Sequence, residues 1–258
     1  MSNETNYRDR YSSSRELTGN DALSLAKVFL YVFIGLTITS VLCLGLAAIY
    51  RYIFSIDYEN GVDANLQMTA VVVLIVTLIA SLIGIIVLSF VVPITVHRGK
   101  RSVLAPAIIY TILMGVALST IAIFIPWYIL GATFLITSII FALMALIALL
   151  SKERLNGLAI AAIGLFVGAG IISLFLWILM LILPAGTITW LYWVVMLCAF
   201  AGMMLITIWD MNRIKQIAAE GEMTNNLSLY CAFILYNDFI NILLRVLRII
   251  LLVMARRK

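Results

Sequence analysis

Charged residues are scarce in this sequence of 258 residues. Asp, Glu, Lys and Arg together make up 11% of the chain, whereas 64% of its residues are hydrophobic. A soluble domain typically has about a quarter charged residues and about half apolar ones. A water-soluble globule of this length could not bury so many apolar side chains, so the surplus must face lipid. The composition therefore predicts an integral membrane protein.

Histidine and cysteine, the usual ligands of zinc, are also rare. The single histidine, His97, cannot form a histidine metal site alone, and the three cysteines have no C-x-x-C spacing. Because these cysteines lie in apolar segments, they predict neither a disulfide framework nor a zinc site. The sequence has no H-E-x-x-H, G-x-S-x-G, Walker A or dinucleotide-binding motif. We therefore expect neither an enzyme nor a resident cofactor.

Seven apolar stretches are long enough to cross a bilayer as helices, since a span needs about 20 residues. The first six are nearly free of charge, and the seventh is not. This pattern predicts an all-α, polytopic membrane protein with seven transmembrane helices. A polar tail, residues 1–26, shows no signal peptide and precedes the transmembrane domain, residues 27–258. The predicted spans are 28–52, 68–95, 103–125, 128–150, 157–183, 187–209 and 229–255.

The connectors after the second, fourth and sixth stretches are basic. The positive-inside rule therefore places them, and the N-terminus, in the cytoplasm. The pI near 9.2 reflects basic residues beside apolar segments, which favours anionic lipid headgroups over nucleic acid as partners. Seven spans leave the C-terminus outside, although it ends in Arg256-Arg257-Lys258; a last segment that re-enters and returns to the cytoplasm is the alternative. The inner connectors hold Arg98, Lys100, Arg101, Lys152, Arg154, Arg213 and Lys215, and the first outer connector holds Asp57, Glu59 and Asp63.

Small residues predict where the uncharged helices touch. Such helices must associate through close packing, which small residues at x-x-x spacing permit. Gly164 with Gly168, and Gly115 with Ser119, have this spacing. We expect both pairs to lie at helix contacts.

The last apolar stretch carries a polar stripe. At 100° per residue, six polar residues cover about one third of the helix circumference, a surface that lipid cannot satisfy. Asp238 lies within this stretch and Asp210 at the inner end of the sixth, whereas the other ten acidic residues lie in tails or connectors. An ionisable group inside the bilayer indicates a functional site, but an ion pair with arginines that snorkel to the surface is an equal alternative. The stripe comprises Tyr230, Asn237, Asp238, Asn241, Arg245 and Arg248.

Three segments resemble the transmembrane Bax-inhibitor-motif family. Residues 234–248, I-L-Y-N-D-F-I-N-I-L-L-R-V-L-R, are similar to its C-terminal signature, roughly S-L-Y-L-D-F-I-N-L-F-x-x-L-L-R. Residues 209–215, W-D-M-N-R-I-K, resemble its Y-D-x-x-x-I-K, and residues 110–121 resemble its third helix. The resemblance covers the second to seventh stretches, and the D-F-I-N block is its most specific part. The Y-D and G-x-G-D motifs of intramembrane aspartyl proteases are not matched.

The resemblance implies a seven-helix fold with a central last helix and a pH-sensitive calcium leak gated by two aspartates. Carried over by position, these aspartates are Asp210 and Asp238, which would also line a transient calcium path. A basic residue at the inner end of the second helix, Arg98 or Lys100, would latch the pair. The family arginine matches Arg248. The stretch between the aspartates is about one helical turn longer than is usual in the family. If the extra residues lie within a helix, they would alter the pairing of the two aspartates. If they lie within a loop, the pairing would be unchanged.

The sequence is compatible with three functions. The first is a calcium leak channel of a membrane, expected to be the bacterial cytoplasmic membrane, with lipid, calcium and protons as partners. The second is a regulatory protein that binds a membrane protein partner, for instance to modulate a protease or a stress response, without ion flux. The third is a proton-coupled exchanger, which the lack of an internal repeat disfavours.

Overall fold

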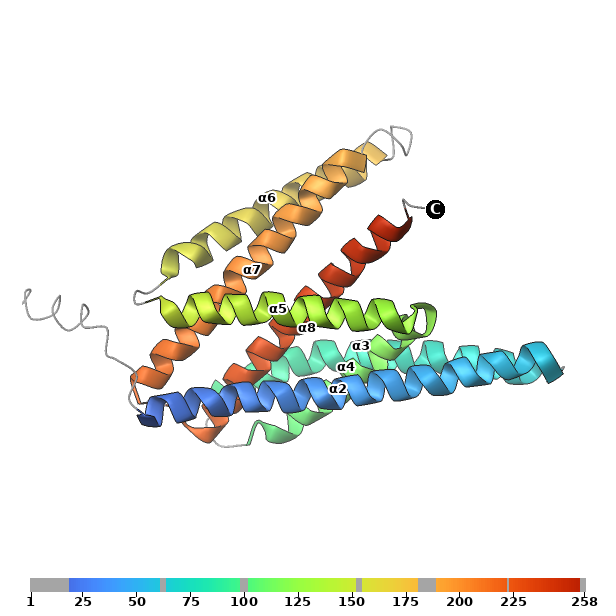
Figure 1. Ribbon diagram of the computed structural model, residues 1–258, viewed down its shortest axis with the longest axis horizontal. Helices are drawn as coiled ribbons and strands as arrows, with labels where there is room; N and C mark the ends of the chain where they lie inside the picture. The colour runs from blue at the N-terminus through green and yellow to red at the C-terminus, as the bar shows by residue number, and fades with distance from the viewer. Residues whose placement is uncertain are drawn as a thin grey trace, which may run out of the picture. The chain divides into compact units, whose positions relative to one another are not determined.

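The computed structural model describes residues 19–60, 64–97, 102–151, 155–180, 189–221 and 223–255. Every regular element in these ranges is an α-helix (Figure 1). This confirms the all-α architecture. The helices are α2 (Gly19–Asn60), α3 (Ala64–His97), α4 (Leu104–Phe124), α5 (Trp127–Leu150), α6 (Asn156–Met180), α7 (Thr189–Ala219) and α8 (Asn225–Ala255).

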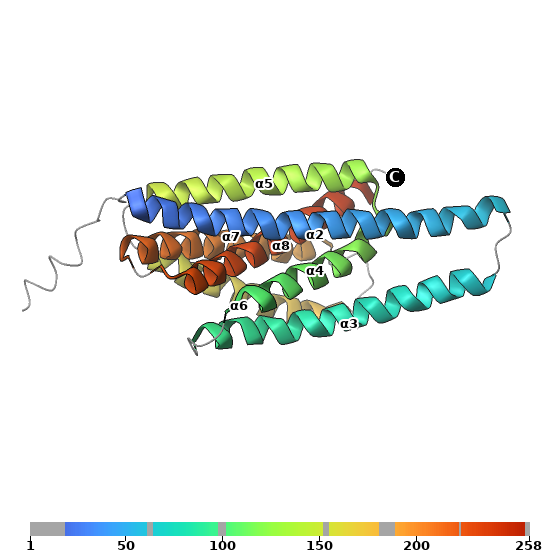
Figure 2. The same cartoon turned by 90° about the horizontal axis from the view of Figure 1, so that it is seen from below.

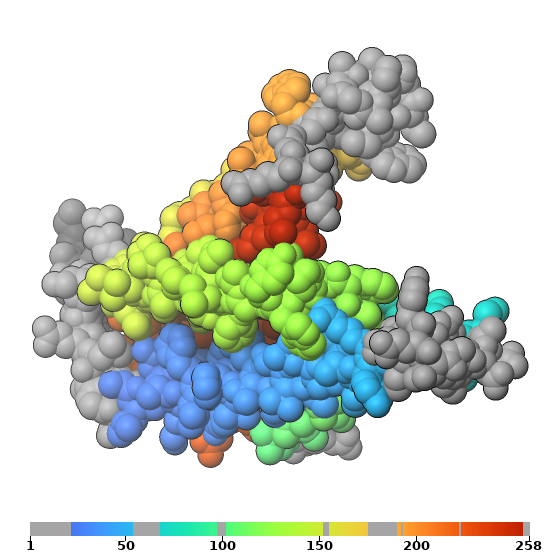
Figure 3. Space-filling model, turned by 45° about the vertical axis from the view of Figure 1, so that its right-hand side comes forward, coloured from blue at the N-terminus to red at the C-terminus, as the bar shows by residue number. Residues whose placement is uncertain are grey.

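Six of these helices, α2 to α7, are long and apolar enough to cross a membrane. Large apolar side chains remain exposed along them, for instance Phe33 on α2 and Leu135 on α5, and much of both helices lies at the surface in Figure 3. Such surfaces are stable against lipid rather than water. The chain is therefore a multi-pass membrane protein.

The last helix, α8, is not among these six candidate spans. It is a continuous helix of 31 residues, which spans roughly 46 Å at about 1.5 Å per residue. A segment that turned back inside the bilayer would need a break within this range. The continuity of α8 thus favours a full span over the re-entrant alternative.

The clearest differences from the predicted boundaries are in the first and sixth helices, and the first begins at Gly19 rather than at residue 28. The first helix continues to Asn60, so Asp57 and Glu59 belong to α2 rather than to a connector. The sixth predicted span should end at 209, yet α7 continues to Ala219. It ends where Gly221 adopts φ 75°, a left-handed conformation that glycine adopts readily after a helix. The fall in hydropathy after Trp209 marks the end of the apolar run, not the end of the helix.

The chain divides into two compact units, of which the first comprises Ala26–Phe134 and Met223–Tyr236. Within it, α3 packs along α4 (Figure 2). Helix α4 also approaches α2 closely, because a Cβ at Gly115 would lie 2.9 Å from Leu42 Cβ and 3.0 Å from the Thr39 carbonyl oxygen. The Thr39 hydroxyl lies 2.6 Å from Tyr236 Oη. The predicted contact at Gly115 is confirmed.

In the same unit, the side chain of Arg51 binds the backbone carbonyl groups at the end of α4. The Arg51 guanidinium donates to the Ala122 carbonyl at 2.5 Å, to the Ile123 carbonyl at 3.0 Å, and to the Ile125 carbonyl. The guanidinium carbon also lies 4.3 Å from the Trp127 ring centroid. Carbonyls at a helix end lack partners within the helix, and a cation there also complements the helix dipole. Arg51 therefore stabilises the α4–α5 turn.

The second unit comprises Leu135–Glu222 and Asn237–Lys258, together with the start of α2. Here α6 packs along α7, and the close approach is at Gly202, whose added Cβ would lie 3.4 Å from Leu165 Cβ. A Cβ at Gly164 or Gly168 would meet no described atom within 4 Å. The expectation that these two glycines mark a contact is wrong, because Gly164 lies on an exposed face of α6.

Candidate functional site

Asp238 is the single acidic residue of α8. It is 8% exposed, and the ring of Phe239 packs edge-on against Phe141 of α5 with centroids 5.3 Å apart. Among the described side chains, Asp238 Oδ2 is the one buried polar atom without a hydrogen-bond partner. Such an atom in a folded protein needs an explanation, because most buried polar groups are paired. A neutral carboxyl group costs less to bury in this way than a charged one.

The hydroxyl of Thr207 on α7 lies beside Asp238 and hydrogen-bonds with its carboxyl group. The same hydroxyl donates to the Met203 carbonyl at 2.9 Å. A hydroxyl has one proton, which it can give either to the Met203 carbonyl or to the Asp238 carboxyl group. Thr207 therefore connects the Asp238 side chain of α8 with α7.

Asp210 lies on the same side of α7 as Thr207, three residues further along, where neighbours share a helix face. Its carboxylate lies close enough to Asp238 for the two to repel each other electrostatically. It also lies close to the Arg213 guanidinium, again three residues along α7. Asp210 is half-buried and Arg213 is exposed. The site thus contains two carboxyl groups, one deep and one shallower, with a cation beside the shallower one.

The two aspartates lie within electrostatic range of each other although both flanking segments are helical. The stretch between them contains the end of α7, the residues 220–224, and the first turns of α8. The additional residues of this stretch therefore do not separate the pair. Asp210, predicted at a helix end, lies inside α7.

The other predicted site residues lie at different depths. Asn237, Asn241 and Arg245 are half-buried, and Arg248 is exposed and repels Arg245 electrostatically. Tyr230 is half-buried in the other unit. The predicted latch, Arg98 or Lys100, lies outside the described residues. The structure therefore brings Asp210 and Asp238 together and places Arg248 at the surface.

Two side chains, those of Lys215 and Asn212, anchor α7 just beyond Asp210, and Gln216 of the same helix supports Asn212. Lys215 Nζ donates to the carbonyls of Leu149 at 2.5 Å and Ser151 at 2.9 Å, at the end of α5. The Asn212 amide is 2% exposed; it donates to the Ala148 carbonyl at 3.4 Å and accepts from the Leu155 N–H at 3.3 Å. Gln216 donates to Asn212 Oδ1 at 2.7 Å. These bonds hold α7 to the α5–α6 turn.

Sequence reasoning missed Thr207 and Arg213 as partners of the aspartates. Each lies three residues from Asp210, a spacing that brings side chains together on a helix. This signal was hidden because the helix was expected to end at residue 209. Among the described residues, no group of three or more His, Cys, Asp or Glu side chains is arranged to hold a metal ion.

Comparison with known proteins agrees with the resemblance of the three segments. A family model described as "Inhibitor of apoptosis-promoting Bax1" matches residues 22–257. No curated protein and no solved structure matches the chain. Because the family model covers nearly the whole sequence, including both aspartates, the chain belongs to the Bax1-inhibitor family.

Proposed function

We propose that this protein is a pH-sensitive calcium leak channel in which Asp210 and Asp238 share a proton and form the gate. The observation that carries the proposal is the buried, unpartnered Oδ2 of Asp238 beside a second carboxyl group. Two carboxyl groups at close range cannot both ionise easily, so they retain one proton between them. The pair then carries a single negative charge and the path stays closed.

Loss of the shared proton opens the path by repulsion. Two unit charges about 4 Å apart repel by about 4 kcal/mol at an effective dielectric constant near 20. Turning a mostly closed population into a mostly open one requires roughly 5.5 kcal/mol. The repulsion supplies most of this free energy, so rising pH on the side of the pair opens the channel and acid closes it.

Cations near the pair set the closed state. In this proposal, Arg98 or Lys100 neutralises the singly charged pair as a latch. Arg213 lies beside Asp210 and stabilises its charge, so Asp238 is the group that retains the proton when the pair holds one. Calcium suits the path because it prefers oxygen ligands and tolerates irregular geometry.

Calcium flux into liposomes tests the proposal. The purified protein is reconstituted, and flux is measured with pH 6 and then pH 8 on the side of the pair. We expect flux in the wild type to rise with pH, and Asp238→Asn to lose that dependence because its side chain has no proton to release. Glu220→Gln is the matched control, since Glu220 is an exposed acidic residue after the end of α7; it should respond to pH as the wild type does.

The outcomes separate the competing functions. A normal pH response in Asp238→Asn would reject the paired-carboxylate gate. No flux above that of empty liposomes at either pH would favour the regulatory membrane protein. Saturable counterflow driven by a proton gradient would favour the exchanger.

A further inference from the structure

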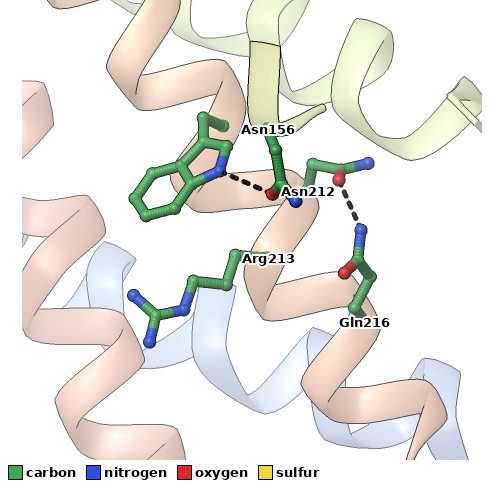
Figure 4. A pocket seen from close by; sticks show the side chains of 5 residues that line it. Asn156, Asn212, Arg213 and Gln216 are labelled. Carbon is green, nitrogen blue, oxygen red and sulfur yellow. Dashed lines mark hydrogen bonds between the residues drawn. The ribbon is translucent and has the colours of Figure 1, made fainter. Parts of the chain in front are cut away.

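A small polar cavity lies at the junction of α6 and α7. It has a volume of about 140 Å³, and an ordered water takes about 30 Å³. The cavity therefore accommodates a group of roughly four to five non-hydrogen atoms, too small for a nucleotide and close to the size of a phosphate group. Figure 4 shows the side chains around it. The lining residues are Asn156, Trp209, Asn212, Arg213 and Gln216.

The lining residues offer more donors than acceptors. Arg213 presents a guanidinium with five N–H groups in a fork, and its carbon lies 5.4 Å from the Trp209 ring centroid. Asn156 Oδ1 accepts from the Trp209 indole N–H at 3.5 Å, which leaves the Asn156 amide N–H groups to donate. A fork of guanidinium donors matches the oxygens of a phosphate group. The cavity is thus suited to an anion.

One hydrogen-bond acceptor in the cavity restricts the class of possible ligands further. Gln216 uses its N–H₂ group to donate to Asn212 Oδ1, so its side-chain oxygen remains as an acceptor. A phosphate ester that also carries a hydroxyl or ammonium group would satisfy both the Arg213 donors and this oxygen. Asn212 itself is occupied by its bonds to the α5–α6 turn.

The position of the cavity along the helices indicates the source of such a group. The span of α5 ends at Leu150 and the span of α6 begins at Asn156, and the cavity lies beside this turn. Ends of spanning helices lie at the level of lipid headgroups. Basic residues at this level attract anionic headgroups.

We propose that this cavity binds a phosphate ester bearing a hydrogen-bond donor, with Arg213 holding the phosphate and Gln216 accepting from the donor. Phosphatidylglycerol and soluble glycerol phosphate share this chemistry. The proposal rests on the cavity, and because Arg213 also lies beside Asp210, its test measures binding rather than flux.

Native mass spectrometry of the full chain in a neutral detergent tests this site. The probes are short-chain phosphatidylglycerol, short-chain phosphatidylcholine, whose headgroup has no hydrogen-bond donor, and sn-glycerol 3-phosphate. We expect Arg213→Gln to weaken binding of phosphatidylglycerol by about tenfold or more, equivalent to ~1.4 kcal/mol. Arg213→Lys should retain part of the affinity, because it keeps the charge but loses the fork.

Lys27→Gln is the matched control. Lys27 is exposed on α2, so this variant removes one positive charge at a distance in sequence from the cavity and should bind as the wild type does. Binding of phosphatidylglycerol that depends on Arg213 identifies a lipid headgroup as the source, and Arg213-dependent binding of glycerol phosphate alone identifies a soluble ester. Equal binding by the wild type and Arg213→Gln with every probe would overturn the proposal. So would equal weakening in Lys27→Gln, because the effect would then be one of net charge.

Discussion

Arg51 and Asp238 are both ionisable residues on helices of a membrane protein, but their surroundings differ. Arg51 donates to three backbone carbonyls at the end of α4 and lies against the Trp127 ring. Asp238 has one oxygen bound to Thr207 and another, buried, without a partner. A charge that is fully hydrogen-bonded stabilises the fold, whereas an unsatisfied buried group stores free energy that a proton or ion can release.

In a chain with so few charges, a buried ionisable group that lacks hydrogen-bond partners is the place to expect chemistry. The presence of a charged side chain within a span does not by itself distinguish a structural role from a functional one. The number of hydrogen-bond partners of the side chain distinguishes the two roles. Arg51 has several such partners, whereas one oxygen of Asp238 has none. Substitutions at each should therefore affect different measurements.

Asp238→Asn should have the largest functional effect. We expect the pH dependence of calcium flux to disappear, while the free energy of unfolding stays within about 1 kcal/mol of the wild type, because a neutral amide replaces a group that was incompletely paired. Flux and thermal unfolding of the same preparation measure both quantities. A variant that unfolds readily would place Asp238 with Arg51, as a structural residue.

Arg51→Met should have the opposite profile. Removing the guanidinium leaves the carbonyls at the end of α4 without their donor, which should cost about 2–4 kcal/mol of stability. Thermal unfolding in detergent measures the loss, and flux at two pH values in the protein that remains folded should keep its pH dependence. A lost pH dependence would contradict the assignment of Arg51 to structure.

Lys215→Met should be milder. Lys215 Nζ bonds to two carbonyls at the end of α5, but Asn212 continues to hold the same turn. We expect a loss of about 1–2 kcal/mol, since a hydrogen bond to a charged group is worth about 1.5–3 kcal/mol and part of it is recovered by solvent. Denaturation monitored by tryptophan fluorescence checks this value, and Lys27→Gln serves as the control for lost charge.

Thr207→Val should have the smallest effect on stability and still shift the gate. Valine keeps the shape of threonine but removes the hydroxyl that bonds with Asp238, at a cost of about 1 kcal/mol. We expect the pH midpoint of flux to move while the maximum flux is retained, which a full pH titration would reveal. An unchanged midpoint would mean that Thr207 does not contribute to proton binding.

The sequence predicts the apolar architecture well because each span is a long, nearly uncharged run. The family resemblance also assigns Asp210 and Asp238 to one site, and the two carboxyl groups lie within electrostatic range of each other. Helix ends are less predictable: residues 210–219 are polar but contain no glycine or proline, so α7 continues through them. Hydropathy falls at Trp209, whereas the helix ends only near Gly221.

Contacts between helices are also difficult to predict from the sequence. The Gly164–Gly168 spacing was as suitable as that of Gly115 and Ser119, yet only Gly115 approaches a neighbouring helix. Spacing shows which residues share a face but not which face is turned inward. Thr207 and Arg213 were missed for a related reason, since their relation to Asp210 depends on α7 continuing past it.

The anchoring of α7 bears on which part of the site can move. Asn212 and Lys215 fasten the helix to the α5–α6 turn immediately after Asp210. The backbone that carries Thr207 and Asp210 therefore acts as a stationary frame. In the proposed gate, loss of the shared proton would therefore move Asp238 and the part of α8 that follows it, rather than α7.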